Sequence, residues 1–326
     1  MAKMTMVQAI NLALRQEMEK DDRVIVLGED VGRDGGVFRV TDQLIDEFGE
    51  DRSLDTPLAE AGIVGMSIGM AVYGLRPVCE MQFSGFSYQA FHQIECHAAR
   101  LRLRSQGLCQ VPLVVRAPYG GGVRALEHHS ESRETYYAHT PGLKMVIPSG
   151  PRNARALLIS AIRDPDPVVF FEPKATYRAF REEVPDEEET LPLGKSVKVR
   201  QGKDLTMISY GAMMRPTLEA AETLKEEDGV EAEVIDLLTI SPLDHEVFAE
   251  SVKHTGRAVI VHEAPRSFGP GAEIVSRIME KSFFYLEAPI ARVTGFDVHI
   301  PLFSRESAYL PGKDRILRAA REVLNA

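Results

Sequence analysis

Hydrophobic and polar positions alternate between a helical and a strand-like period through the first half of the chain. Apolar residues recur at helical spacing over 7–18, directly after Thr5 and Gln8, which have the spacing of a capping box. A short apolar run at 24–27 then predicts a buried strand. The same reading predicts helices over 57–73, 88–104 and 151–163, and strands over 77–83, 111–118, 144–148 and 167–173. This rhythm favours an α/β domain with a mostly parallel sheet.

A change of composition predicts a second domain. Residues 182–189, EEVPDEEE, are acidic and poor in apolar residues, which is typical of a solvated linker. A second alternating series follows, with strands predicted in DLTMISYG, VEAEVIDL, RAVIVHE and IARVTG, and helices over 216–227, 244–252 and 271–283. A chain of 326 residues is long for one core. We therefore expect two α/β domains, 1–190 and 191–326.

Charge and cysteine content narrow the function classes. Asp and Glu number 48 against 38 Lys and Arg, a formal charge of -10, whereas nucleic-acid binders usually present a basic face. The three cysteines form no C-x-x-C pair, which argues against a disulfide framework. No apolar run reaches the length of a signal core or a membrane span. We expect a cytoplasmic protein that binds neither nucleic acid nor membranes.

The segment DTPLAEAGIVGMSIGMAVYG holds the most informative acidic residue. Thr56 has the position of an N-cap and Pro57 that of the first helical residue, so Glu60 would be the fourth and capping does not account for it. A carboxyl group buried among these small and apolar neighbours suits proton sharing with a ligand. The alternative is a surface glutamate favoured by the helix dipole. The glycines that follow at helical spacing predict close approach of another backbone.

Two further stretches are candidates for chemistry. His128 and His129 follow three consecutive glycines, and histidine moves protons near neutral pH, although a loop histidine is more often simply exposed. A zinc site there is poorly supported, because no cysteine or zinc motif accompanies the pair. The aromatic residues around Phe86 either pack in the core or stack on a flat cofactor ring. P-loop, G-x-G-x-x-G and G-x-S-x-G motifs are absent.

Taken together and in order, GEDVGRDGGVFRVTD, DTPLAEAGIVG, EMQF, GGGVRALEHHS, PGLKMVIPS, AIRDPDPVVFFEP and VHEAPR resemble β subunits of the decarboxylating component of 2-oxoacid dehydrogenase complexes. The resemblance covers nearly the whole chain. It implies an N-terminal domain that binds the pyrimidine ring of thiamine diphosphate and a C-terminal domain like that of transketolase. It also implies oxidative decarboxylation of pyruvate or a branched-chain 2-oxoacid, with acyl transfer to a lipoyl group.

The resemblance assigns roles to single residues. Glu60 matches the glutamate that shares a proton with the pyrimidine ring, and His129, with His128 beside it, matches the histidine near the substrate and the acyl-transfer step. The ring is lined at the positions of Glu29, Leu58, Gln82 and Phe86. A potassium ion is held at the positions of Leu113, Ala161, Ile162, Asp164 and Asp166, although relatives often have Asn where this chain has Asp166.

The missing motif points to a partner. Thiamine enzymes hold the diphosphate through Mg²⁺ with a G-D-G motif, and this chain has none. The resemblance therefore implies an α subunit that carries the Mg²⁺ ligands, in an assembly of two α and two β chains, and a lipoyl-bearing acyltransferase as further partner. AHTPGLKMV and EAPR favour the branched-chain type. The alternatives are a subunit of another split thiamine enzyme, of transketolase or synthase type, and a non-catalytic scaffold subunit.

Overall fold

The computed structural model describes residues 2–326, and the chain divides into two compact units. The first comprises the chain up to Tyr119 together with Tyr136–Leu193, and the second comprises Gly120–Thr135 and Gly194–Ala326. The stretch 120–135, which carries both candidate histidines, thus groups with the C-terminal part of the chain. No helix within residues 2–326 is long and apolar enough to cross a membrane.

The first unit is built on a parallel sheet, as the sequence predicts. Its strands lie in the order β6-β7-β5-β4-β2-β3, and every neighbouring pair is parallel. The bounds are β2 Val24–Gly28, β3 Ser53–Asp55, β4 Arg76–Glu80, β5 Val114–Tyr119, β6 Lys144–Val146 and β7 Val168–Pro173. β2, β5 and β7 are buried along their whole length, which explains their continuous apolar runs.

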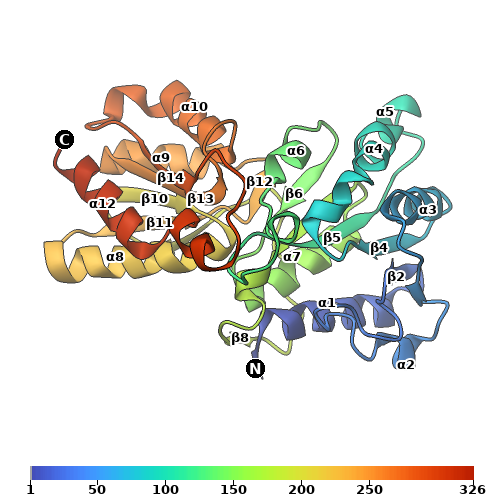
Figure 1. Cartoon of the computed structure of the whole chain (residues 1–326). Helices are drawn as coiled ribbons and strands as arrows, with labels where there is room; N and C mark the ends of the chain where they lie inside the picture. Colours follow the sequence, from blue (N-terminus) through green and yellow to red (C-terminus); the bar gives the residue numbers. More distant parts are fainter. Residues whose placement is uncertain (1) are drawn as a thin grey trace. The chain divides into compact units, whose positions relative to one another are not determined.

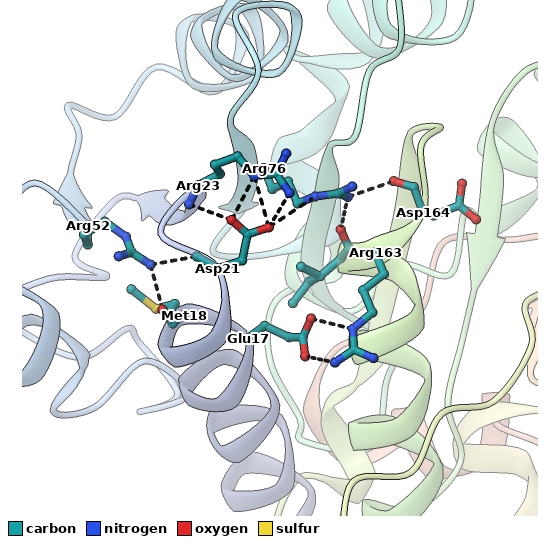
Figure 2. A network of polar contacts seen from close by, with 9 residues as sticks. Glu17, Met18, Asp21, Arg23, Arg52, Arg76, Arg163 and Asp164 are labelled. Carbon is teal, nitrogen blue, oxygen red and sulfur yellow. Dashed lines mark hydrogen bonds and ion pairs between the residues drawn. The ribbon is translucent and has the colours of Figure 1, made fainter.

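Two long helices pack together beside this sheet. α1, Met6–Lys20, begins with the predicted capping box of Thr5 and Gln8, and α7, Pro151–Arg163, has Pro151 in its first turn. Figure 1 shows them side by side beneath the strands of the first unit. The buried Glu17 joins them, because its two carboxylate oxygens accept hydrogen bonds from Arg163 Nε and Nη2 at 2.8 and 2.6 Å (Figure 2).

A polar network continues from the end of α1 toward the neighbouring strands (Figure 2). Asp21 accepts hydrogen bonds from Arg23, which with the nearby charge of Arg76 lowers the pKa of Asp21 to about 2. Arg52 donates to the carbonyl oxygens of Met18 and Asp21, which the helix end leaves without helical partners. The network therefore fixes the end of α1 against the residues just before β2 and β3 and against the start of β4.

Two predicted helices of the first unit differ from the structure. The helix predicted over 57–73 is α3, Glu60–Val72, and Thr56 does not cap it. The Thr56 amide instead donates to the Gly28 carbonyl at 2.9 Å, which keeps the chain extended past the end of β3. The helix predicted over 88–104 is broken into α4, Phe91–Gln93, a π-helical turn at Ile94–Ala98, and α5, Leu101–Arg104.

The acidic stretch 182–189 is not simply a solvated linker. Glu182–Val184 forms strand β8, which pairs antiparallel with β1, Ala2–Met4. Further along, Glu188 forms ion pairs with Arg163 and Lys20, and Glu189 with Arg152. These contacts tie the stretch to α1 and α7, so its charges serve attachment as well as solvation.

The second unit has a sheet between two pairs of helices. The strand order is β14-β13-β10-β11-β9, and only the edge strand β9 runs antiparallel. α8 and α12 pack together on one face, and α9 and α10 on the other (Figure 1). The bounds are β9 Val197–Arg200, β10 Leu205–Ser209, β11 Ala232–Asp236, β13 Ala258–Pro265, β14 Ala291–Gly295, α8 Met214–Asp228, α9 His245–Thr255, α10 Pro270–Ser282 and α12 Lys313–Leu324.

Candidate active site

The candidate residues of the first unit gather where three parallel strands end. Gly28 of β2 lies in register between Asp55, the last residue of β3, and Glu80, the last residue of β4. Glu29 follows β2 directly, and Gln82 lies two residues after the end of β4. The carboxyl ends of neighbouring parallel strands form the usual ligand-binding edge of an open α/β sheet.

Glu60 is the first residue of α3 and is buried, with 5% of its surface exposed. It is not the fourth helical residue, and the alternative of an exposed surface glutamate is wrong. Its Oε2 atom is buried and accepts no hydrogen bond from the described part of the chain, and the Oγ1 atom of Thr56 is likewise buried and unbonded. Buried polar atoms almost always have partners. These two atoms therefore mark a place for polar groups of a ligand.

A second carboxyl group lies within electrostatic reach of Glu60. Burial raises the pKa of Glu29, and the negative charges of Asp30 and Glu60 raise it further. The loop that carries Glu29 is attached to the end of β4, because Gln82 Nε2 donates to Asp30 Oδ2 at 2.9 Å. A carboxyl group whose pKa is raised in this way is suited to holding a proton beside a bound ring.

Aromatic rings and an exposed apolar side chain complete this edge. Phe83 contacts Phe38 and Phe86 edge to face, each at 5.5 Å between ring centroids. Phe86 lies in a short 3₁₀ helix, Ser84–Tyr88, and is half-buried. Leu58 is 64% exposed on the extended segment before α3. An apolar side chain presented this way suits contact with a flat ring or with another chain.

A buried ion-pair cluster that the sequence analysis missed lies beneath the edge. Arg116 of β5 donates to Glu80 Oε2 at 2.8 Å and to both carboxylate oxygens of Glu172 on β7, at 2.7 and 3.1 Å. Tyr177 also donates to Glu172, at 2.6 Å. Gly36, whose φ is +79°, passes so close to the cluster that a Cβ atom there would lie 3.2 Å from Glu80 Oε1. The cluster therefore supports the loop that follows Glu29.

His128 and His129 lie in the second unit, in a short 3₁₀ helix, Glu127–His129. His128 is exposed and His129 is half-buried, and their ring centroids are 4.2 Å apart. Among residues 2–326 no group of three His, Cys, Asp or Glu side chains is arranged to hold a metal ion.

The predicted potassium ligands lie together but already have cationic partners. The Ile162 carbonyl accepts a hydrogen bond from Arg76 at 2.7 Å, and Figure 2 shows the same guanidinium reaching Asp164. Lys144 Nζ lies 2.6 Å from both carboxylate oxygens of Asp164, and Arg102 donates to Asp166 at 2.5 Å.

The remaining two carbonyls, of Leu113 and Ala161, accept backbone N–H groups at 2.9 and 3.3 Å. Oxygen ligands suit a hard cation, but here three positive side chains compete for these oxygens. As arranged in this structure, the five residues do not fit a potassium ion. The ion implied by the resemblance stays a prediction that requires Arg76 to move.

Comparison with known proteins gives consistent results over the whole chain. The transketolase pyrimidine-binding domain family matches residues 2–179, and the transketolase C-terminal domain family matches residues 194–316. A solved split-gene transketolase, described as an inactive β4 tetramer, superimposes with a TM-score of 0.82 over 99% of both chains. At 21% identity that likeness shows the fold alone.

Curated relatives are much closer in sequence. The pyruvate dehydrogenase E1 component subunit beta of Acholeplasma laidlawii is 49% identical over 100% of this chain and 99% of its own. Its counterparts from Staphylococcus epidermidis and Staphylococcus aureus are 51% identical over 99% of both chains. The chain therefore belongs to the family of E1 β subunits of thiamine-dependent 2-oxoacid dehydrogenases, of the pyruvate or branched-chain type.

Proposed function

We propose that this chain is the β subunit of an enzyme that oxidatively decarboxylates pyruvate or a branched-chain 2-oxoacid and transfers the acyl group to a lipoyl group. The observation that carries the proposal is Glu60, a buried carboxyl group with an unbonded oxygen at the carboxyl edge of a parallel sheet. The names of the curated relatives support pyruvate over the branched-chain substrates.

In this proposal the first unit binds the aminopyrimidine ring of thiamine diphosphate. When bound, the cofactor supplies the carbanion chemistry that the protein's side chains lack. Glu60 Oε2 has the freedom to hold or return a proton at a ring nitrogen, since no protein donor occupies it. Glu29 and Gln82 shape the polar wall, and Phe86 and Leu58 contact the flat faces.

We propose that His129, with His128 beside it, acts near the substrate and in acyl transfer. A half-buried histidine suits proton delivery to an acyl-accepting sulfur, because imidazole side chains exchange protons near neutral pH. In this proposal residues 1–190 bind the ring, and residues 191–326 dock the lipoyl-bearing acyltransferase component. The acidic chain, with a formal charge of -10, suits a basic partner through steering and rim contacts.

The proposal assigns the diphosphate and its Mg²⁺ to an α subunit, in an assembly of two α and two β chains. Two observations support a second chain. The sequence has no G-D-G motif for the metal. In addition, α3 presents Gly62, Met66 and Gly69 to its exposed side, and a Cβ atom at Gly69 would meet nothing within 4 Å in this chain. A surface of this kind permits close approach of a neighbouring backbone.

The test is a steady-state comparison of the assembled α–β enzyme on pyruvate and on branched-chain 2-oxoacids, with a lipoyl domain as acceptor. We expect reductive acylation of the lipoyl group with at least one of these substrates. Thiamine-dependent carbon–carbon bond formation or ketol transfer without lipoyl acylation would instead indicate a synthase or transketolase subunit. Cofactor binding with no turnover of any substrate would indicate a scaffold.

A further inference from the structure

The loop that carries His128 and His129 is attached at several points to elements of its own unit. We call residues 120–135 the histidine loop. At its base the Gly120 N–H donates to the Glu131 carbonyl at 3.0 Å, which closes the loop on itself. The structure offers two buried carboxylates, Glu263 and Glu306, that neither the cofactor edge nor the core explains.

Glu263 lies near the carboxyl end of β13, a strand whose other side chains are mainly apolar. It is buried, with 2% of its surface exposed, and its Oε2 atom accepts the Gly121 N–H at 3.0 Å. Carboxylates are rarely buried in a sheet without a specific partner, because loss of hydration disfavours their charge. The partner here is the backbone of the histidine loop.

Glu306, the first residue of the short helix α11, Glu306–Tyr309, makes the second attachment. It is 4% exposed, and its Oε2 atom accepts the Arg124 N–H at 2.9 Å. At the far end of the loop, Tyr210 donates to the buried Glu134 at 2.5 Å. Attachments thus lie on both sides of the two histidines.

The glycines of the loop are explained by the same carboxylates. Gly120 has a φ of +80°, and a Cβ atom there would lie 2.3 Å from Glu263 Oε1. A Cβ atom at Gly121 would lie 2.8 Å from the side chain of Ile300 and 3.2 Å from Glu306 Oε1. A side chain at either position would push the loop off the carboxylates. The glycines and the two glutamates therefore act together to fix the loop backbone.

We propose that Glu263 and Glu306 are positioning residues for His129, and that they hold the loop so that the imidazole is correctly placed for the transfer step. This inference rests on the proposed function of His129. Neither glutamate needs to touch substrate or cofactor, because each acts through a backbone N–H of the loop. A displacement of a reacting group by about 1 Å is enough to lower a rate about 10²-fold.

The experiment uses the full chain assembled with its α subunit and compares Glu263→Ala, Glu263→Gln and Glu306→Ala with wild type. The matched control is Glu233→Ala, because Glu233 is equally buried in the same unit but pairs with Lys198 on β9. Amide hydrogen exchange, followed by mass spectrometry, measures directly how firmly the loop backbone is held. Turnover with a lipoyl domain measures the effect of the loop on the reaction.

We expect Glu263→Ala to speed exchange at Gly121 and across 127–130 about tenfold or more, since a hydrogen bond to a charged group is lost. Glu306→Ala should do the same at Arg124. Lipoyl acylation should fall about 10²-fold with little change in KM for the 2-oxoacid. Glu263→Gln should restore most of both properties, because its amide oxygen can still accept from Gly121. Glu233→Ala should change neither.

A double variant separates positioning from general stability. If Glu263 acts through His129, adding Glu263→Ala to His129→Ala should lower turnover no further. The inference would be overturned if the double variant lost turnover by the product of the two single losses. It would also be overturned if amide exchange in 121–130 were unchanged in both Glu263→Ala and Glu306→Ala. Wild-type turnover in His129→Ala alone would instead refute the proposed role of His129, and the exchange data would still decide whether the carboxylates hold the loop.

Discussion

His262 should make the second unit sensitive to acid. It lies on β13, is fully buried, and its Nε2 atom accepts the Gly271 N–H at 3.2 Å at the start of α10. Burial, reinforced by the charges of Arg292 and Arg266, lowers the pKa of this imidazole from 6.5 to about 3. A Cβ atom on Gly271 would lie 2.7 Å from the ring nitrogen, so little space remains for a hydrated cation.

The direction of the pH effect on stability follows from proton binding in the folded and unfolded states. The folded histidine stays neutral, whereas the unfolded one binds a proton below about pH 6.5, so protons favour unfolding. The contribution to stability is complete above pH 6.5 and is lost as the pH falls toward 3. The slope is about 1.4 kcal/mol per pH unit, so lowering the pH from 6.5 to 5 should cost about 2 kcal/mol from this one residue.

Urea unfolding of the full chain at several pH values between 5 and 7.5 measures this effect. The His262→Gln variant should be less stable at pH 7 but should show a pH dependence flatter by about 2 kcal/mol over that interval. The control is His254→Gln, at an exposed position on α9, which should run parallel to wild type. Parallel curves for wild type and His262→Gln would refute the reasoning.

Three further predictions concern the first unit and its ligands. Arg163→Gln should lower the free energy of unfolding by about 3 kcal/mol in urea titrations, because it leaves the buried carboxylate of Glu17 without its cationic partner. Glu17→Gln should lower it by only about 1.5 kcal/mol, because the half-exposed Arg163 side chain that it leaves is still hydrated. Equal losses would contradict this asymmetry. The chain without an α subunit should bind thiamine diphosphate weakly in calorimetric titration with Mg²⁺ present, because its sequence has no G-D-G motif for the Mg²⁺-bound diphosphate. Micromolar binding would refute the shared site. Replacing K⁺ by Na⁺ should leave the melting temperature unchanged in wild type, since Arg76 bonds the carbonyl oxygen of Ile162, and a rise specific to K⁺ would show that the guanidinium gives way to the ion.

The sequence predicted the architecture well where a pattern is repeated along many residues. Parallel strands buried on both faces appear as apolar runs, and the capping box at Thr5 has a local physical cause. The start of α3 was predicted wrongly, because the hydrogen bond from Thr56 to Gly28 joins segments far apart in the sequence. Spacing rules cannot anticipate such a bond.

The site was predicted only in part, because some of its contacts also join segments that are far apart in the sequence. Glu60 stood out because capping did not account for it, and its burial is confirmed. The Glu80–Arg116–Glu172 cluster was missed, although charged residues at the ends of the apolar runs in β4, β5 and β7 were a usable signal. Which carboxylates meet the glycines of the histidine loop depends on tertiary packing, because Gly121 and Glu263 are far apart in the sequence.

The central claim is that the unbonded carboxyl oxygen of Glu60 activates the cofactor. Glu60→Gln is nearly isosteric, so fold and assembly should survive, and the amide can still contact the ring but cannot share a proton with it. The most direct measurement is exchange of the thiazolium C2 proton in heavy water, followed by NMR on the assembled α–β enzyme. The account predicts exchange slower by about 10²–10⁴-fold in Glu60→Gln. Exchange at the wild-type rate would contradict it, since Glu60 would then not be the activating acid.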